Sequence, residues 1–180
     1  APKEMRSRPI GIGTGPCGLF AGLILAQMGF RPIILERGKA VRERTRDTFG
    51  FWRDSVLDPE SNVQFGEGGA GTFSDGKLTS RVKNPLMGLV KETLVELGAP
   101  PDILIDAKPH IGTDRLRAVV VNFRQKLLSL GCEIRFGALV SDFMMREGRL
   151  VGVVVNGAEE VKVDHLVLAQ SKEDADSSIY

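Results

Sequence analysis

Short apolar runs at the start of the chain alternate with one longer apolar stretch. Ile10 and Ile12 predict a strand, residues 19–28 predict a helix, and residues 31–35 predict a second strand that stops at the acid Glu36. Apolar runs of these lengths, separated by glycines, are typical of buried strands and a buried helix. The order strand, helix, strand predicts a βαβ unit over residues 8–40.

The pattern after residue 48 predicts helices first and strands afterwards. Phe51 and Trp52 lie in a segment expected to pack on the sheet, and Thr113 is expected to cap a later helix. The expected helices are 48–57, 86–97 and 116–130, and the expected strands are 132–136, 138–144, 150–155 and 161–168. This order predicts a doubly wound α/β domain with an antiparallel meander insertion, whose last strand returns to the main sheet.

A glycine fingerprint joins the first strand to the first helix. Gly13 permits a tight turn, Gly15 lets a pyrophosphate approach the main chain, and Gly18 allows the helix to pack closely. Unpaired N–H groups at the helix N-terminus favour an anion there. Glu36 follows Gly18 by 18 residues, close to the spacing of the acid that binds a ribose hydroxyl. The sequence therefore predicts a site for a dinucleotide whose ribose has a free 2′-hydroxyl.

A basic run follows the acid. Five Arg or Lys residues and one acid occupy positions 37–46. Such a run is typical of a solvated helix face, and its place after Glu36 equally fits arginine contacts to the adenine or the pyrophosphate. Cys17, at the start of the first helix, is interpreted as a small packing residue rather than a redox thiol.

A second glycine-rich segment covers residues 65–78. Five glycines in fourteen residues exclude a helix or a regular strand. Thr72 and Ser74 add hydroxyl donors, which favours a loop whose backbone amides face a ligand, with a flexible surface loop as the alternative. Phe65 and Phe73 are expected to anchor it. The segment lacks the spacing of a Walker motif.

Composition narrows the function. The 180 residues fit one domain, residues 1–180, ending in a polar tail at 172–180, and 42% hydrophobic residues support a core. A net charge of +1 argues against nucleic acid as a partner, and the apolar stretches are too short for a membrane span. Two cysteines without ligand spacing argue against a metal site, and with no signal peptide pattern they indicate the cytoplasm.

The chain from Pro9 to about Ala169 resembles the N-terminal FAD-binding region of bacterial FAD-dependent dehydrogenases, flavoproteins of the glutathione-reductase-like class. The matching stretches are GTGPCGLFAGL at 13–23, LERGKAVRERTRD at 35–47, LDPESNVQFGEGGAGTFSDGKL at 57–78, GAP at 98–100 and KPHIGTD at 108–114. The resemblance implies a Rossmann-like FAD/NAD(P)-binding domain. It also implies FAD contacts by Gly13, Gly15, Pro16, Cys17, Glu36, Arg37, Gly38, Arg44, Gly69, Ala70, Gly71, Thr72 and Val140.

The family's usual length and second glycine motif are not matched, since this chain reads Leu168-Ala169-Gln170-Ser171. The expectation is a truncated FAD-binding portion of an oxidoreductase, acting on a small-molecule substrate or redox partner, with NAD(P)H as a candidate. Two alternatives stay open, a non-catalytic nucleotide-binding remnant and an NAD-binding dehydrogenase domain. No catalytic residue is assigned, because His110 and His165 have no identifiable partner, and the oligomeric state is not predicted.

Overall fold

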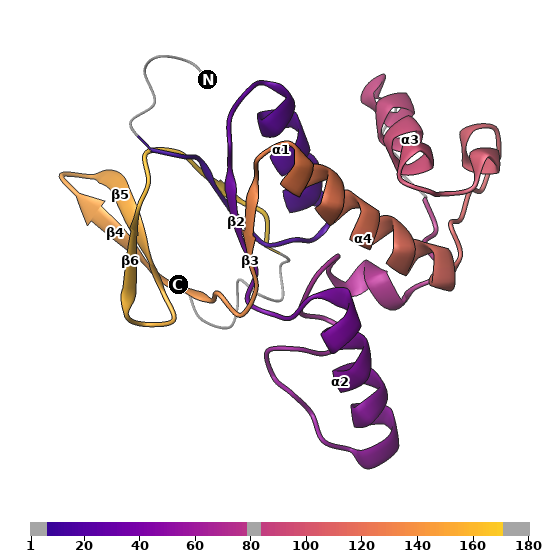
Figure 1. Ribbon diagram of the computed structural model, residues 1–180, viewed down its shortest axis with the longest axis horizontal. Helices are drawn as coiled ribbons and strands as arrows, with labels where there is room; N and C mark the ends of the chain where they lie inside the picture. The colour runs from indigo at the N-terminus through magenta and orange to yellow at the C-terminus, as the bar shows by residue number, and fades with distance from the viewer. Residues whose placement is uncertain (1–6, 79–83, 171–180) are drawn as a thin grey trace.

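The computed structural model describes residues 7–78 and 84–170, and this part of the chain folds into two β-sheets and four α-helices (Figure 1). The predicted tail at 172–180 lies outside the described residues. The helices are α1 (Pro16–Gln27), α2 (Val41–Asp54), α3 (Leu86–Glu96) and α4 (Thr113–Ser129). The strands are β1 (Ile10–Ile12), β2 (Ile33–Leu35), β3 (Glu133–Arg135), β4 (Val140–Arg146), β5 (Arg149–Val155), β6 (Glu159–Lys162) and β7 (Leu166–Leu168).

The central sheet is parallel, with strand order β3-β2-β1-β7. Ile10 lies opposite Ile33 on one side and Leu166 on the other. The second sheet is an antiparallel meander in the order β4-β5-β6. The predicted fold class, a parallel sheet with helices and an antiparallel meander insertion, is therefore confirmed.

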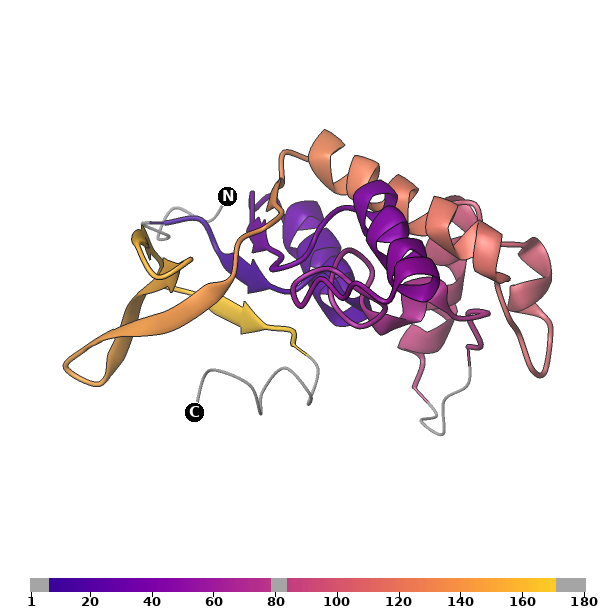
Figure 2. The ribbon, with the colours of Figure 1, turned by 90° about the horizontal axis from the view of Figure 1, so that it is seen from below.

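Side-chain alternation in β2 explains the layers. Ile34 packs with α1, α3 and α4 in one core cluster. Ile33 and Leu35 point to the opposite face, where they join the antiparallel sheet in a second cluster. Both faces of the central strands β1 and β2 are thus buried, which is why neither strand carries a polar side chain. Figure 2 shows the meander at one end of the molecule and the helices at the other.

Helix α2 differs from the prediction. It begins at Val41, and its buried residues are Val41, Arg44 and Thr48. These positions share one helix face, and Phe51 and Trp52 continue that face in the last turn of the helix, where Trp52 is 56% exposed. The expectation that Phe51 and Trp52 pack on the sheet is wrong, because burial of α2 ends at Thr48 and its last turn extends beyond the core.

The predicted strand at 161–168 is two strands. Val163 still donates a backbone hydrogen bond to Val151 of the meander, whereas the carbonyl of His165 accepts one from Ile10 of the parallel sheet. The chain changes sheets between these residues and delivers β7 to the edge of β1. A smaller correction concerns α4, whose cap is Gly112 with φ of 90°, while Thr113 is already helical.

Candidate functional site: a cavity between the two glycine segments

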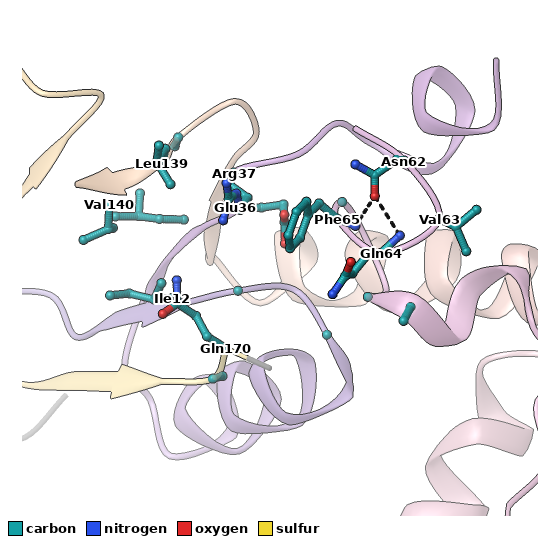
Figure 3. A pocket seen from close by; sticks show the side chains of 18 of the residues that line it. Ile12, Glu36, Arg37, Asn62, Val63, Gln64, Phe65, Leu139, Val140 and Gln170 are labelled. Carbon is teal, nitrogen blue, oxygen red and sulfur yellow. Dashed lines mark hydrogen bonds between the residues drawn. The ribbon is translucent and has the colours of Figure 1, made fainter. Parts of the chain in front are cut away.

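A cavity of about 870 Å³ lies at the carboxyl ends of β1 and β2 (Figure 3). This is the edge where parallel α/β sheets bind ligands. The helix α1 N-terminus, the start of β4, the segment 57–70 and residues 169–170 surround it. Its lining includes nine of the predicted residues, namely Gly13, Gly15, Pro16, Cys17, Glu36, Arg37, Gly69, Ala70 and Val140.

The first glycine segment is shaped for both packing and ligand approach. Gly13 has φ of 98°, and a Cβ there would lie 2.8 Å from the carbonyl oxygen of Ala169. At Gly15, by contrast, an added Cβ would meet no protein atom within 4 Å. Because Gly15 lines the cavity and precedes α1 directly, the helix amides that follow it are accessible to an anion.

Glu36 directly follows β2, and its carboxylate is buried at the cavity wall. The amide and the hydroxyl of Thr14 both donate to Oε2, at 2.9 and 2.5 Å, and the amide of Gly38 donates to Oε1 at 2.8 Å. The side chain is thus fixed by three donors. Gly38 itself does not appear in the cavity lining, since it packs against the segment that follows α2, where a Cβ would come within 2.5 Å of the Cα of Gly66.

Arg37 follows the acid and has its guanidinium held in place. Its Nε and Nη2 donate to the two carboxylate oxygens of Glu60 at 2.7 and 2.9 Å. The same guanidinium lies over the Phe65 ring, 4.3 Å from the ring centre. Figure 3 shows Arg37 beside Phe65, and Glu36, Arg37 and Phe65 all line the cavity. A planar cation in this position is suited to stacking on a flat ring or pairing with an anion.

Arg44, which the sequence predicts to contact the phosphates, lies buried behind the loop that lines the cavity. Its side chain is 0% exposed and is not part of the cavity lining among the described residues. Its guanidinium donates to five backbone carbonyls, those of Asn62, Val63, Gly66, Glu67 and Gly69. Burial lowers the pKa of Arg44 from 12.5 to about 10, so the group stays charged at neutral pH. Arg44 therefore shapes the loop that lines the cavity.

The second glycine segment forms the opposite wall. Its residues Ala70–Phe73 make one 3₁₀ turn, and Gly69 and Ala70 face the cavity. Thr72 is buried and donates its hydroxyl to the carbonyl of Glu67 at 2.8 Å. Gly71 and Thr72 are not in the described lining: Thr72 supports this wall from behind, whereas Gly71 is exposed.

Glu67 is a buried acid behind the same wall. Its Oε2 accepts hydrogen bonds from the Val41 amide at 2.7 Å and from Arg124 at 3.0 Å, while its buried Oε1 has no partner among the described residues. Burial raises the pKa of Glu67 above its ordinary 4.5, and the charge of Arg124 opposes that rise. The carboxylate thus caps one of the first amides of α2, that of Val41.

Sequence reasoning missed several lining residues. Phe51 and Leu57 were assigned to sheet packing, and Asn62, Val63 and Gln64 carry no motif of their own. The signal that could have found them is their position between the two glycine segments, which the fold brings together. Neither His110 nor His165 lines the cavity in the described structure, and both are exposed.

Comparison with solved structures supports the fold. The chain is 18% identical to THI4 of Thermovibrio ammonificans, with a TM-score of 0.57 over 92% of this chain and 57% of that one. It is 14% identical to a variant of the halogenase PltM in complex with FAD, with a TM-score of 0.55 over 92% of this chain and 34% of that one. A 3-ketosteroid-Δ4-(5α)-dehydrogenase from Rhodococcus jostii is 16% identical, with a TM-score of 0.52 over 93% and 47%. At these identities the likeness establishes a Rossmann-like fold.

Comparison with sequences adds one relative. An uncharacterized protein of Clostridium beijerinckii is 46% identical over 167 residues, which are 93% of this chain and 31% of the relative. The chain therefore spans about a third of the length of that protein. No protein-family model matches the chain. No helix among residues 7–78 and 84–170 is long and apolar enough to cross a membrane.

Proposed function

We propose that this chain binds FAD in the cavity and forms the FAD-binding part of an oxidoreductase. The observation that carries the proposal is the pairing of Gly15 and Glu36 on one cavity wall. Gly15 leaves open space before the N-terminus of α1, and Glu36 presents an oriented carboxylate at the end of β2. The first suits a pyrophosphate and the second suits a ribose hydroxyl.

The cavity residues near Gly15 and those near Glu36 both fit the parts of FAD proposed to lie there. The volume of about 870 Å³ lies in the upper part of the range for cofactor pockets. Gly13, Gly15, Pro16 and Cys17 would hold the pyrophosphate, with Gly69 and Ala70 opposite. Arg37 and Val140 would flank the adenine. Gly38, Arg44 and Thr72 would support the walls without touching the ligand, and Gly71 would lie at the exposed edge of the second glycine segment.

FAD, when bound, supplies hydride or electron transfer, while the chain supplies binding, orientation and exclusion of water. The reaction partner would be a small molecule or a redox partner, with NAD(P)H among the candidates. The apolar lining from Phe51, Leu57 and Val63 would keep water away from part of the ligand. We assign no residue to acid or base chemistry on a substrate, and we treat the chain as one FAD-binding unit.

The test is to identify the nucleotide that the protein carries or accepts. The purified protein is denatured, and the released nucleotide is separated by chromatography; if none is released, FAD, FMN, NAD and NADP are titrated separately. We expect FAD, because Glu36 accepts from a ribose hydroxyl and repels a 2′-phosphate. Selective binding of FMN or NADP would contradict the proposal, and selective binding of NAD would favour a nicotinamide-dependent dehydrogenase domain.

A further inference from the structure

The Glu36 carboxylate is already heavily hydrogen-bonded by the chain itself. Both donors of Thr14 reach Oε2, and the Gly38 amide reaches Oε1. A carboxylate offers about four acceptor positions. Three are filled, so about one remains, and it belongs to Oε1.

The single open acceptor position limits how many ribose hydroxyls the Glu36 carboxylate can bind. A carboxylate with two open oxygens can accept from both ribose hydroxyls at once. With Oε2 engaged by Thr14, Glu36 has one open position for a ligand in the cavity that it lines. Donors on both oxygens also resist rotation of the carboxylate, which keeps Oε1 in one orientation.

Of the three donors, the hydroxyl of Thr14 is the one that depends on residue identity. The amides of Thr14 and Gly38 would remain with most side chains, whereas a hydroxyl at position 14 requires Thr or Ser. Thr14 is 0% exposed, so water cannot replace the lost donor without a rearrangement. Its carbonyl accepts from the Gly68 amide at 2.9 Å, which fixes the backbone from which the hydroxyl projects.

We propose that Thr14 is a specificity-determining positioning residue, which holds Glu36 so that the carboxylate accepts a hydrogen bond from one ribose hydroxyl of an adenine nucleotide and not from two. This inference rests on the proposed nucleotide site and deepens it. Thr14 acts through Glu36 and needs no contact with the ligand.

The test uses ADP, 2′-deoxy-ADP and 3′-deoxy-ADP as probes in calorimetric titrations. The wild-type protein should lose about tenfold in affinity for one of the two deoxynucleotides, the effect of one hydrogen bond to a charged acceptor, and keep its affinity for the other within roughly twofold. The Thr14→Val variant has nearly the same shape without the hydroxyl. In this variant the affinities for the two deoxynucleotides should differ by roughly threefold or less.

Two variants separate positioning from a general loss of structure. Thr14→Ser restores the hydroxyl and should restore the wild-type discrimination. Thr93→Val removes an exposed hydroxyl that bonds the carbonyl of Leu89 on α3, away from the cavity, and should leave all three affinities unchanged. Thermal unfolding without nucleotide shows whether each variant is folded. If Thr14→Val does not fold, Thr14→Ala takes its place with the same expectation.

The outcomes distinguish the inference from the proposed function. A wild-type protein that binds ADP but discriminates equally against both deoxynucleotides, or against neither, overturns the inference alone. An unchanged discrimination in Thr14→Val also overturns it. If the wild-type protein binds neither FAD nor ADP, the proposed function is overturned, and the inference with it.

Discussion

The backbone amide of Gly68 donates a 2.9 Å hydrogen bond to the carbonyl oxygen of Thr14. This bond joins the two glycine segments directly, although 54 positions separate them in the sequence. A Cβ placed on Gly69 would lie 3.2 Å from the Cα of Gly15, so the two main chains pass close to each other beside it. The cavity is therefore framed by main chain from both segments.

Replacing Gly15 by Val should weaken nucleotide binding more than folding. The added side chain would meet no protein atom at its Cβ, and it would project where the pyrophosphate is proposed to lie. We expect at least about a tenfold loss of FAD affinity, or roughly 1.4 kcal/mol, with little change in the unfolding midpoint without ligand. Gly88→Val is the matched control, because its Cβ also has open space but lies on α3. An unchanged affinity in Gly15→Val would remove this glycine from the site.

Replacing Arg44 by Lys should loosen the loop at 62–69. A lysine keeps the charge but cannot reach five carbonyls with one ammonium group. We expect a loss of about 2 to 4 kcal/mol in unfolding free energy, since several buried carbonyls lose a charged donor. Amide hydrogen exchange should rise in this loop first. Arg42→Lys, at an exposed position of the same helix, should change neither property; equal effects from both variants would refute the assignment.

The buried acid Glu67 gives a pH dependence with a defined sign. Because burial raises its pKa above 4.5, the folded chain holds a proton that the unfolded chain releases first. The unfolding free energy of the wild type should therefore fall, relative to Glu67→Gln, as pH rises from about 4.5 through the raised pKa. Urea unfolding of both proteins over this range measures the difference. A difference that grows in the opposite direction would show that Arg124 outweighs burial.

Two aromatic residues should differ strongly in their contribution to stability. Phe123 is 2% exposed and packs edge-on against Phe20, with ring centres 5.1 Å apart. Phe123→Ala should cost about 3 to 5 kcal/mol. Trp52 is 56% exposed and contacts Phe49, so Trp52→Ala should cost about 1 kcal/mol or less. Chemical denaturation compares the two variants, and a large loss from Trp52→Ala would place this helix face in a buried interface.

Local patterns predicted the first βαβ unit well. A strand, a glycine turn, a helix and an acid follow each other within a short stretch, and each residue type has a local physical reason. The positions of Glu36 and Gly15 on one wall follow from that unit alone. The helix at 113–129 and the meander were likewise visible as changes in hydrophobic period.

Long-range contacts explain what the sequence did not reveal. Arg44 is charged, so its place in the core depends on five carbonyls from a loop that begins 18 positions later. The split of 161–168 into two strands depends on which sheet each half meets. The third hydrogen bond of Glu36 requires the rotamer of the Thr14 side chain, which no periodicity encodes.

The change of sheets before β7 brings the end of the described chain over its beginning. Ala169 donates its amide to Ile12 at 2.9 Å, and its carbonyl oxygen closes the space beside Gly13. The cavity thus forms only when Ala169 meets Ile12 and Gly13, which lie more than 150 positions earlier in the sequence. Unfolding at either end of this span removes the cavity. A bound nucleotide would raise the unfolding free energy of the whole fold by mass action, by about 2.7 kcal/mol at a concentration one hundred times its Kd. Thermal shift with added nucleotide would therefore report folding and binding in a single curve.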